Sequence, residues 1–188
     1  MPRQRNRRYA IPGLLALTLL TAILITCTRQ QSTAPPTPPA PPAASVTKAG
    51  PPELYPDPAL TPGFANPDIT QDNVADTICN PAWSTRSIRP PTTYTTRLKR
   101  EQLRELGLTG ALSEFEEDHF ISLELGGHPT DPRNLWPEPY NPKPGARQKD
   151  VVENYLHKQV CAGTLTLKQA QDAISADWYK VYLEIRRR

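Results

Sequence analysis

The sequence predicts a small α+β domain that is mainly helical and contains one β-hairpin. Apolar residues recur at helical spacing over residues 146–160, which predicts an amphipathic helix. Upstream of it, two short segments rich in strand-forming residues flank Gly126-Gly127, a pair typical of a turn. We place this domain at residues 64–188, a length typical of one folding unit.

The first half of the domain is expected to hold two helices separated by a loop. Thr70 can cap a short helix over residues 70–78, and several prolines mark a loop around Trp83. The next helix covers about residues 95–106. It ends before Gly107, because glycine is favoured just after the last helical turn.

The hairpin is expected to pair a strand at residues 118–123 with a short strand at residues 134–136. Pro137 should stop the second strand, because proline has no N–H to donate. Residues 139–145 then form a loop. Three helices complete the chain, at residues 146–160, 167–174 and 178–185. The first has an apolar stripe formed by Val151, Val152, Tyr155 and Leu156.

Residues 1–31 have the pattern of an export signal or membrane anchor, a basic start followed by an apolar run over residues 11–27. The run ends in Leu24-Ile25-Thr26-Cys27, which resembles a bacterial lipobox. The resemblance implies that Cys27 is lipidated, and an uncleaved anchor is the alternative. We therefore expect an exported protein, a lipoprotein or membrane-anchored, that faces the periplasm or the cell exterior.

Residues 32–63 are predicted to form a linker, because 11 of these 32 residues are proline. Such a segment favours an extended, stiff spacer. The net charge of +3 comes from the N-terminal part, because residues 1–63 carry six basic and two acidic side chains, whereas residues 64–188 carry 16 basic and 17 acidic ones. The domain as a whole thus lacks the strongly basic surface of many nucleic-acid-binding domains. A local cluster remains as a candidate for phosphate contacts, and its members are Arg97, Lys99, Arg100 and Arg104, with Arg86 and Arg89 just before them.

The three cysteines also bear on the compartment. If Cys27 is lipidated, an exported domain favours a disulfide between Cys79 and Cys161. In the chain-entropy model, a ring of this size adds roughly 4 kcal/mol of stability. Two buried thiols are the alternative.

Three elements in the middle of the domain carry the chemistry. Asp118-His119 comes first, Gly126-Gly127 follows, and Asn134-Leu135 precedes the helix at residues 146–160. In this order they resemble the signature of the HNH (ββα-metal) nucleases. The resemblance covers residues 115–160 and implies a metal-dependent nuclease that hydrolyses DNA or RNA, with Mg²⁺ as the cofactor.

The resemblance also assigns roles to individual residues. His119 matches the general base, Asp118 a metal ligand, and Asn134 the residue that orients the base. These residue types suit the reaction, because a neutral imidazole can accept a proton near pH 7. A carboxylate can also hold a hard divalent cation that neutralises the phosphate. A purely structural Asp-His-Asn arrangement is the alternative.

The family's second metal ligand has no match at its expected place, because residues 145–147 offer no ligand. Asp150 is the first candidate to replace it and Asn154 the second. Both lie on a helix face with Glu153 and His157, and a simply solvated face is the alternative.

Two functions follow from these observations. The first is a nuclease that works outside the cytoplasm on nucleic acid, as a monomer held at a membrane. The second is a catalytically inactive lipoprotein that keeps the HNH-like scaffold as a binding or structural module.

Overall fold

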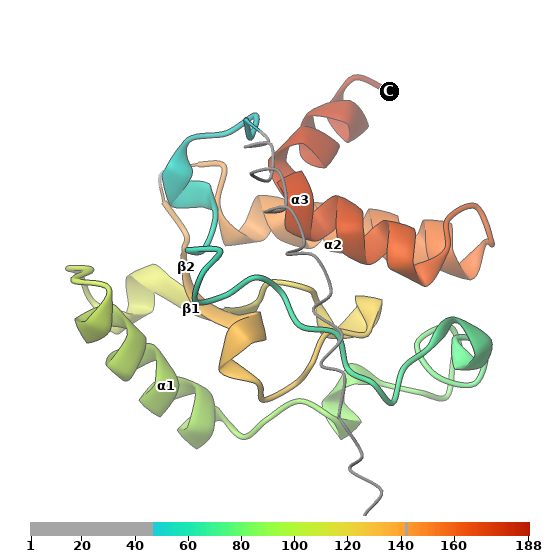
Figure 1. Cartoon of the computed structure of the whole chain (residues 1–188), viewed down its shortest axis with the longest axis horizontal. Coiled ribbons are helices and arrows are strands. Elements are labelled where there is room, and N and C mark those ends of the chain that lie inside the picture. Colours follow the sequence, from blue (N-terminus) through green and yellow to red (C-terminus); the bar gives the residue numbers. More distant parts are fainter. Residues whose placement is uncertain (1–46, 142) are drawn as a thin grey trace, which may run out of the picture. The chain divides into compact units, whose positions relative to one another are not determined.

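The computed structural model describes residues 47–141 and 143–188 (Figure 1). These residues contain three α-helices, α1 (Thr92–Glu105), α2 (Ala146–Cys161) and α3 (Leu167–Arg186). They also contain two strands, β1 (Phe115–His119) and β2 (Leu135–Pro139). The predicted α+β class is confirmed. Short 3-10 turns connect the elements, namely η1 (Pro52–Leu54), η2 (Gln71–Asn73), η3 (Thr85–Ser87), η4 (Leu112–Glu114), η5 (Leu123–Leu125) and η6 (Pro132–Asn134).

The two strands form an antiparallel hairpin in which Asp118 pairs with Trp136 and His119 with Leu135. Helix α1 lies on one side of this hairpin, and α2 and α3 pack together on the other (Figure 1). Asp118 and His119 therefore stand at the end of β1, between α1 and the paired helices.

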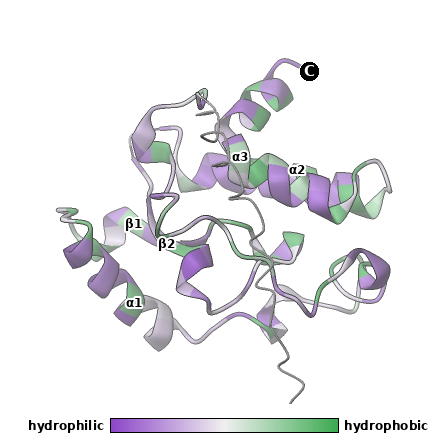
Figure 2. Cartoon of the chain, viewed as in Figure 1, coloured by the Kyte–Doolittle hydropathy of each residue, from purple (hydrophilic) through white to green (hydrophobic). Residues whose placement is uncertain are grey.

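The core lies mainly between the hairpin, the loop after β1 and the paired helices. Trp178, Leu125 and Val152 are completely buried there. Helix α1 contributes little, because Leu103 is its one buried residue. Figure 2 shows accordingly that hydrophilic colours dominate α1.

The compact unit begins earlier than the proline content predicts. Leu54 and Tyr55 belong to the core, and the indole N–H of Trp178 donates to the carbonyl of Leu54 at 2.8 Å. Tyr55 also donates its hydroxyl to Asp177 at 2.5 Å. The prediction that residues 32–63 form a linker is therefore wrong for residues 47–63, because apolar side chains between the prolines pack onto α3.

The strand boundaries differ from those expected. β1 ends at His119 rather than at residue 123, because the chain then enters a long loop instead of a tight turn. β2 continues through Pro137, which pairs with Glu117, to Pro139. Each strand of a two-stranded sheet has an open edge, and proline is tolerated in a strand when its nitrogen faces that edge.

The helix boundaries are closer to expectation. α2 is confirmed almost residue for residue, and α1 begins directly after Pro91, three residues earlier than predicted. The two expected C-terminal helices form α3, whose non-helical Asp177 lies at the predicted break. The prediction of a helix at residues 70–78 is wrong, since only η2 and further turns form there.

Asn73 forms a capping box with Thr70 at the start of η2. Its side chain accepts from the Thr70 backbone N–H and donates to the Asp68 carbonyl, so these contacts begin a short 3-10 turn that is not extended into the expected helix.

Cys27 and the expected signal at residues 1–31 lie outside the described residues. Among the residues that are described, no helix combines the length and apolar composition needed to cross a bilayer.

Candidate active site

His119, the last residue of β1, holds its imidazole in a fixed orientation. Its Nε2 lies 2.9 Å from the carbonyl oxygen of Pro129, and only 4% of the residue is exposed. A carbonyl can only accept, so Nε2 carries the proton and Nδ1 keeps its lone pair. Burial lowers the pKa of His119, against the opposing effect of the Pro129 hydrogen bond. The ring is therefore neutral at pH 7 and can act as a base.

Asn134 holds the loop that carries Pro129. Its side-chain amide donates to the carbonyls of Ile121 and His128, at 2.9 and 3.1 Å, and its oxygen accepts from the Ile121 backbone N–H at 2.9 Å. A β-carbon at Gly127 would lie 1.7 Å from the Ile121 oxygen, so only glycine fits there. Asn134 thus bonds the loop and not the imidazole, and it acts on His119 through Pro129.

A polar cleft of about 250 Å³ lies between α1 and β1, and His119 forms part of its wall. Arg89 and Lys99 line the cleft with positive charge, and Glu116 and Tyr140 line it too. Hydroxyl groups come from the first turns of α1, at Thr92, Thr95 and Thr96. This combination of cations, hydroxyls and a neutral imidazole suits an anionic ligand such as a phosphate.

Glu117 lies on the same face of β1 as His119, two residues earlier, and lines the same cleft. Its two carboxyl oxygens are buried and have no hydrogen-bond partner within the described chain. Burial raises the pKa of Glu117 to about 8, although the charge of Lys99 opposes this. The cleft therefore holds both a neutral base and a protonated acid at pH 7.

Behind β1, Lys149 of α2 occupies the space next to Asp118. Its ammonium lies 2.5 Å from the Asp118 carboxylate, 2.5 Å from Glu153 and 2.9 Å from the backbone oxygen of His119. Glu138 of β2 lies 4.0 Å away. The Lys149 side chain is completely buried, so the ammonium is shielded from solvent and is bonded only within the protein.

The carboxyl groups around Lys149 differ in protonation. Burial alone would raise the pKa of Asp118, but Lys149 overcomes this and holds it below its ordinary value. Burial raises the pKa of Glu138 well above its ordinary range and that of Glu153 to about 8. At pH 7 the charges of Asp118 and Lys149 therefore balance, with both glutamates largely protonated.

The expected ligand set does not fit a divalent metal held between Asp118 and α2. Asp118 is paired with Lys149, which has no lone pair to offer a metal. Asp150 and Asn154 are both exposed, and the Asn154 amide donates to the backbone of Asp150. The structure thus brings Asp118 to Lys149 and Glu153, but not to the two candidate ligands.

The basic residues expected to bind nucleic acid are divided between separate surfaces. Lys99 lines the His119 cleft, where its ammonium also donates to the carbonyls of Leu112 and Phe115. Arg100 and Arg104 instead border another hollow. Arg97 is exposed, near the ring of Tyr94.

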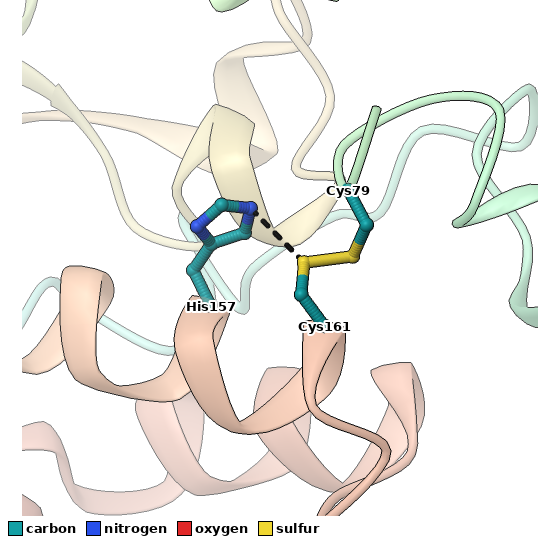
Figure 3. Close-up of side chains that lie close together, drawn as sticks. All are labelled: Cys79, His157 and Cys161. Atoms are coloured by element: carbon teal, nitrogen blue, oxygen red, sulfur yellow. Dashed lines mark hydrogen bonds between the residues drawn. A yellow bond between two sulfur atoms is a disulfide. The ribbon is translucent and has the colours of Figure 1, made fainter. Parts of the chain in front are cut away.

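The disulfide between Cys79 and Cys161 is confirmed, with the two Cα atoms 5.4 Å apart (Figure 3). The ring of His157 lies beside it, with Nε2 3.4 Å from the Cys161 sulfur and 2.8 Å from the carbonyl oxygen of Ile78. These three side chains are close enough to hold a metal ion. In the oxidised protein the sulfurs bond each other, so they are not the thiolates that bind metal.

Comparisons with known proteins add no relative: the chain matches no family model, no curated protein and no solved structure.

Two residues of this site were missed by the sequence analysis. Lys149 is at helical spacing with Val152, Leu156 and Val160, so it belongs to the buried stripe of α2. A lysine in such a stripe indicates a buried partner. Glu117 gave no comparable signal, because its burial depends on the packing of α1 against β1.

Proposed function

We propose that this domain hydrolyses phosphodiester bonds of DNA or RNA, with His119 as the general base. The observation that carries the proposal is the neutral imidazole of His119, whose Nε2 is bonded to Pro129 and whose Nδ1 keeps its lone pair in a cleft that Arg89 and Lys99 line. The chain order of β1, loop, β2 and α2 agrees with the order of the HNH signature, which supports the same reaction.

The residues of the cleft account for each proton in the reaction. Nδ1 of His119 removes a proton from water, and the resulting hydroxide bonds to phosphorus. The phosphorus–oxygen ester bond then breaks, and the leaving oxygen takes the proton of Glu117. Exchange with solvent returns the proton from His119 to Glu117, so each cycle consumes one water molecule. Arg89 and Lys99 stabilise the charge that develops on the phosphate.

Cleavage assays with DNA and RNA test this function directly. The full chain, in mild detergent, should shorten at least one of the two polymers. Arg89→Ala should slow cleavage, because Arg89 lines the cleft. Arg104→Ala is the matched control, since Arg104 is exposed elsewhere, and should leave the rate unchanged. If the wild-type chain shortens neither polymer, the proposed hydrolysis is wrong.

A non-catalytic binding module is the second candidate, and the Lys149–Asp118 pair favours it, because the residue expected to bind metal is already neutralised. A binding module would retain nucleic acid in the same cleft without cutting it. If the chain binds nucleic acid, if Arg89→Ala weakens this binding, and if no cleavage occurs, the protein is a binding module.

We also propose that the protein acts outside the cytoplasm, tethered to a membrane through its N-terminal segment. The disulfide supports an oxidising compartment. Cys27→Ser should release the protein from the membrane fraction or block its maturation. Retention of the variant at full precursor mass would instead indicate an uncleaved anchor.

A further inference from the structure

Lys149 makes the contacts that a metal ion would make at the end of β1. It bridges the carboxylate of Asp118 on β1, the carboxyl group of Glu153 on its own helix and the backbone oxygen of His119, all within 2.9 Å. These partners are oxygen atoms, the ligand type that hard divalent cations take. No other basic side chain of the described residues forms an ion pair with Asp118.

The position of Lys149 in α2 also matters. It stands in the first turn of the helix, on the face that packs against the rest of the domain. The two side chains of α2 that were the candidates for the second metal ligand, Asp150 and Asn154, are both exposed. Helix α2 therefore supplies a cation to this place and no vacant ligand.

We infer that the ammonium of Lys149 takes the place of a divalent metal ion beside Asp118, so that the site excludes such an ion. It follows, if the proposed hydrolysis is correct, that the reaction needs no divalent metal. Lys149 is a positioning residue in this account, because it is completely buried and cannot touch a substrate. Its bond to the His119 carbonyl fixes the end of β1, and with it the base.

Titration with Mn²⁺, followed by electron paramagnetic resonance, tests the inference on the full chain. The wild-type protein should bind no stoichiometric Mn²⁺. Lys149→Asn removes the ammonium and adds a neutral oxygen ligand, so this variant should gain one Mn²⁺ site. Lys149→Met is the matched control, because it removes the same charge without adding a ligand.

Adding Asp118→Asn to the Lys149→Asn variant should abolish the new site. Stoichiometric binding by the wild-type protein that disappears in Asp118→Asn would overturn the inference, as would a folded Lys149→Asn variant that gains no site. If the lysine variants do not fold, the wild-type titration alone decides. The measurement of Mn²⁺ binding does not depend on cleavage. A chain that cuts no nucleic acid would therefore disprove the proposed function, but the Mn²⁺ titration would still test the role of Lys149.

Discussion

The ammonium of Lys149 lies 2.5 Å from the carboxylate of Asp118, in the interior between α2 and β1. The pair joins the helix that follows the hairpin to the strand that carries His119. Removal of one partner from a buried ion pair leaves the other charge without compensation, which is costly. The pair is therefore important to the stability of the domain as well as to its site.

Replacement of Lys149 by methionine should be strongly destabilising. The variant keeps most of the side-chain volume but leaves Asp118 unpaired, so we expect a loss of about 3–5 kcal/mol in the free energy of unfolding. Lys158→Met changes an exposed lysine of the same helix and should cost less than about 0.5 kcal/mol. Chemical denaturation of both variants measures the difference, and equal stabilities would refute the role given to the pair.

Stability should fall as the pH rises from about 6.5 to about 8. Burial raises the pKa of Glu117 and of Glu153 from 4.5 to about 8, so the folded state holds their protons more tightly than the unfolded state does. The resulting stabilisation is complete below the unfolded value and is lost as the pH approaches about 8. The lowered pKa values of Asp118 and His119 have the opposite effect, because they make the folded state less stable as the pH falls. This effect is confined to acidic pH.

Melting temperatures measured over this range test the expectation. Glu117→Gln should flatten the decline, because the amide cannot ionise. Glu105→Gln, at an exposed position of α1, is the matched control. A wild-type protein that becomes more stable between neutral and alkaline pH would contradict these protonation states.

The rate of cleavage should follow a bell-shaped pH profile. On the acidic side the rate rises as His119 loses its proton, at a pKa below the ordinary value of 6.5. On the alkaline side it falls near pH 8, as Glu117 loses the proton it must donate. Glu117→Gln should slow the reaction and remove the alkaline decline. An unchanged alkaline limb in this variant would exclude Glu117 as the acid.

Loss of the disulfide should destabilise the domain by about 4 kcal/mol, because Cys79 and Cys161 are 82 residues apart and the bond restricts a large loop of the unfolded chain. Cys79→Ser and Cys161→Ser should lower the melting temperature equally, and the double variant should lower it no further. A reductant should have the same effect on the wild-type protein. Free thiols at both positions in protein isolated from its native compartment would disprove the bond.

The sequence predicted best the elements whose signals are local. The apolar stripe of α2 and Gly107 after α1 predicted helix positions closely, and the pattern of helices around one hairpin predicted the fold class. The disulfide was also predicted, from compartment and cysteine count. The helix signals depend only on residues that are close together in the sequence.

The parts that failed depend on contacts between distant residues. Gly126-Gly127 indicated a tight turn, but the loop is held open by Asn134, which bonds Ile121 and His128. The high proline content before residue 64 indicated a linker, so the sequence did not predict that Leu54 belongs to the core. Its burial against Trp178 depends on a contact between residues far apart in the chain.

The candidate site was predicted in part. The sequence analysis singled out His119 and Asp118, and the structure places both at the end of β1. Their neighbour Lys149 was missed, because the expected apolar stripe of α2 included Val151, which is exposed, and left out Lys149, which is buried. The metal expected at Asp118 followed from the resemblance alone, and only the fold shows an ammonium beside that carboxylate.

Relaxation of supercoiled plasmid by the full chain in excess EDTA tests the role of His119 most directly. We expect the wild-type protein to nick the plasmid in EDTA as fast as it does with Mg²⁺. His119→Gln should be about 10²–10⁴-fold slower, as expected for the loss of a general base, with its melting temperature unchanged. His157→Gln, a matched change outside the cleft, should nick at the wild-type rate. Nicking that requires added Mg²⁺, or equal rates for the wild-type protein and His119→Gln, would contradict the account.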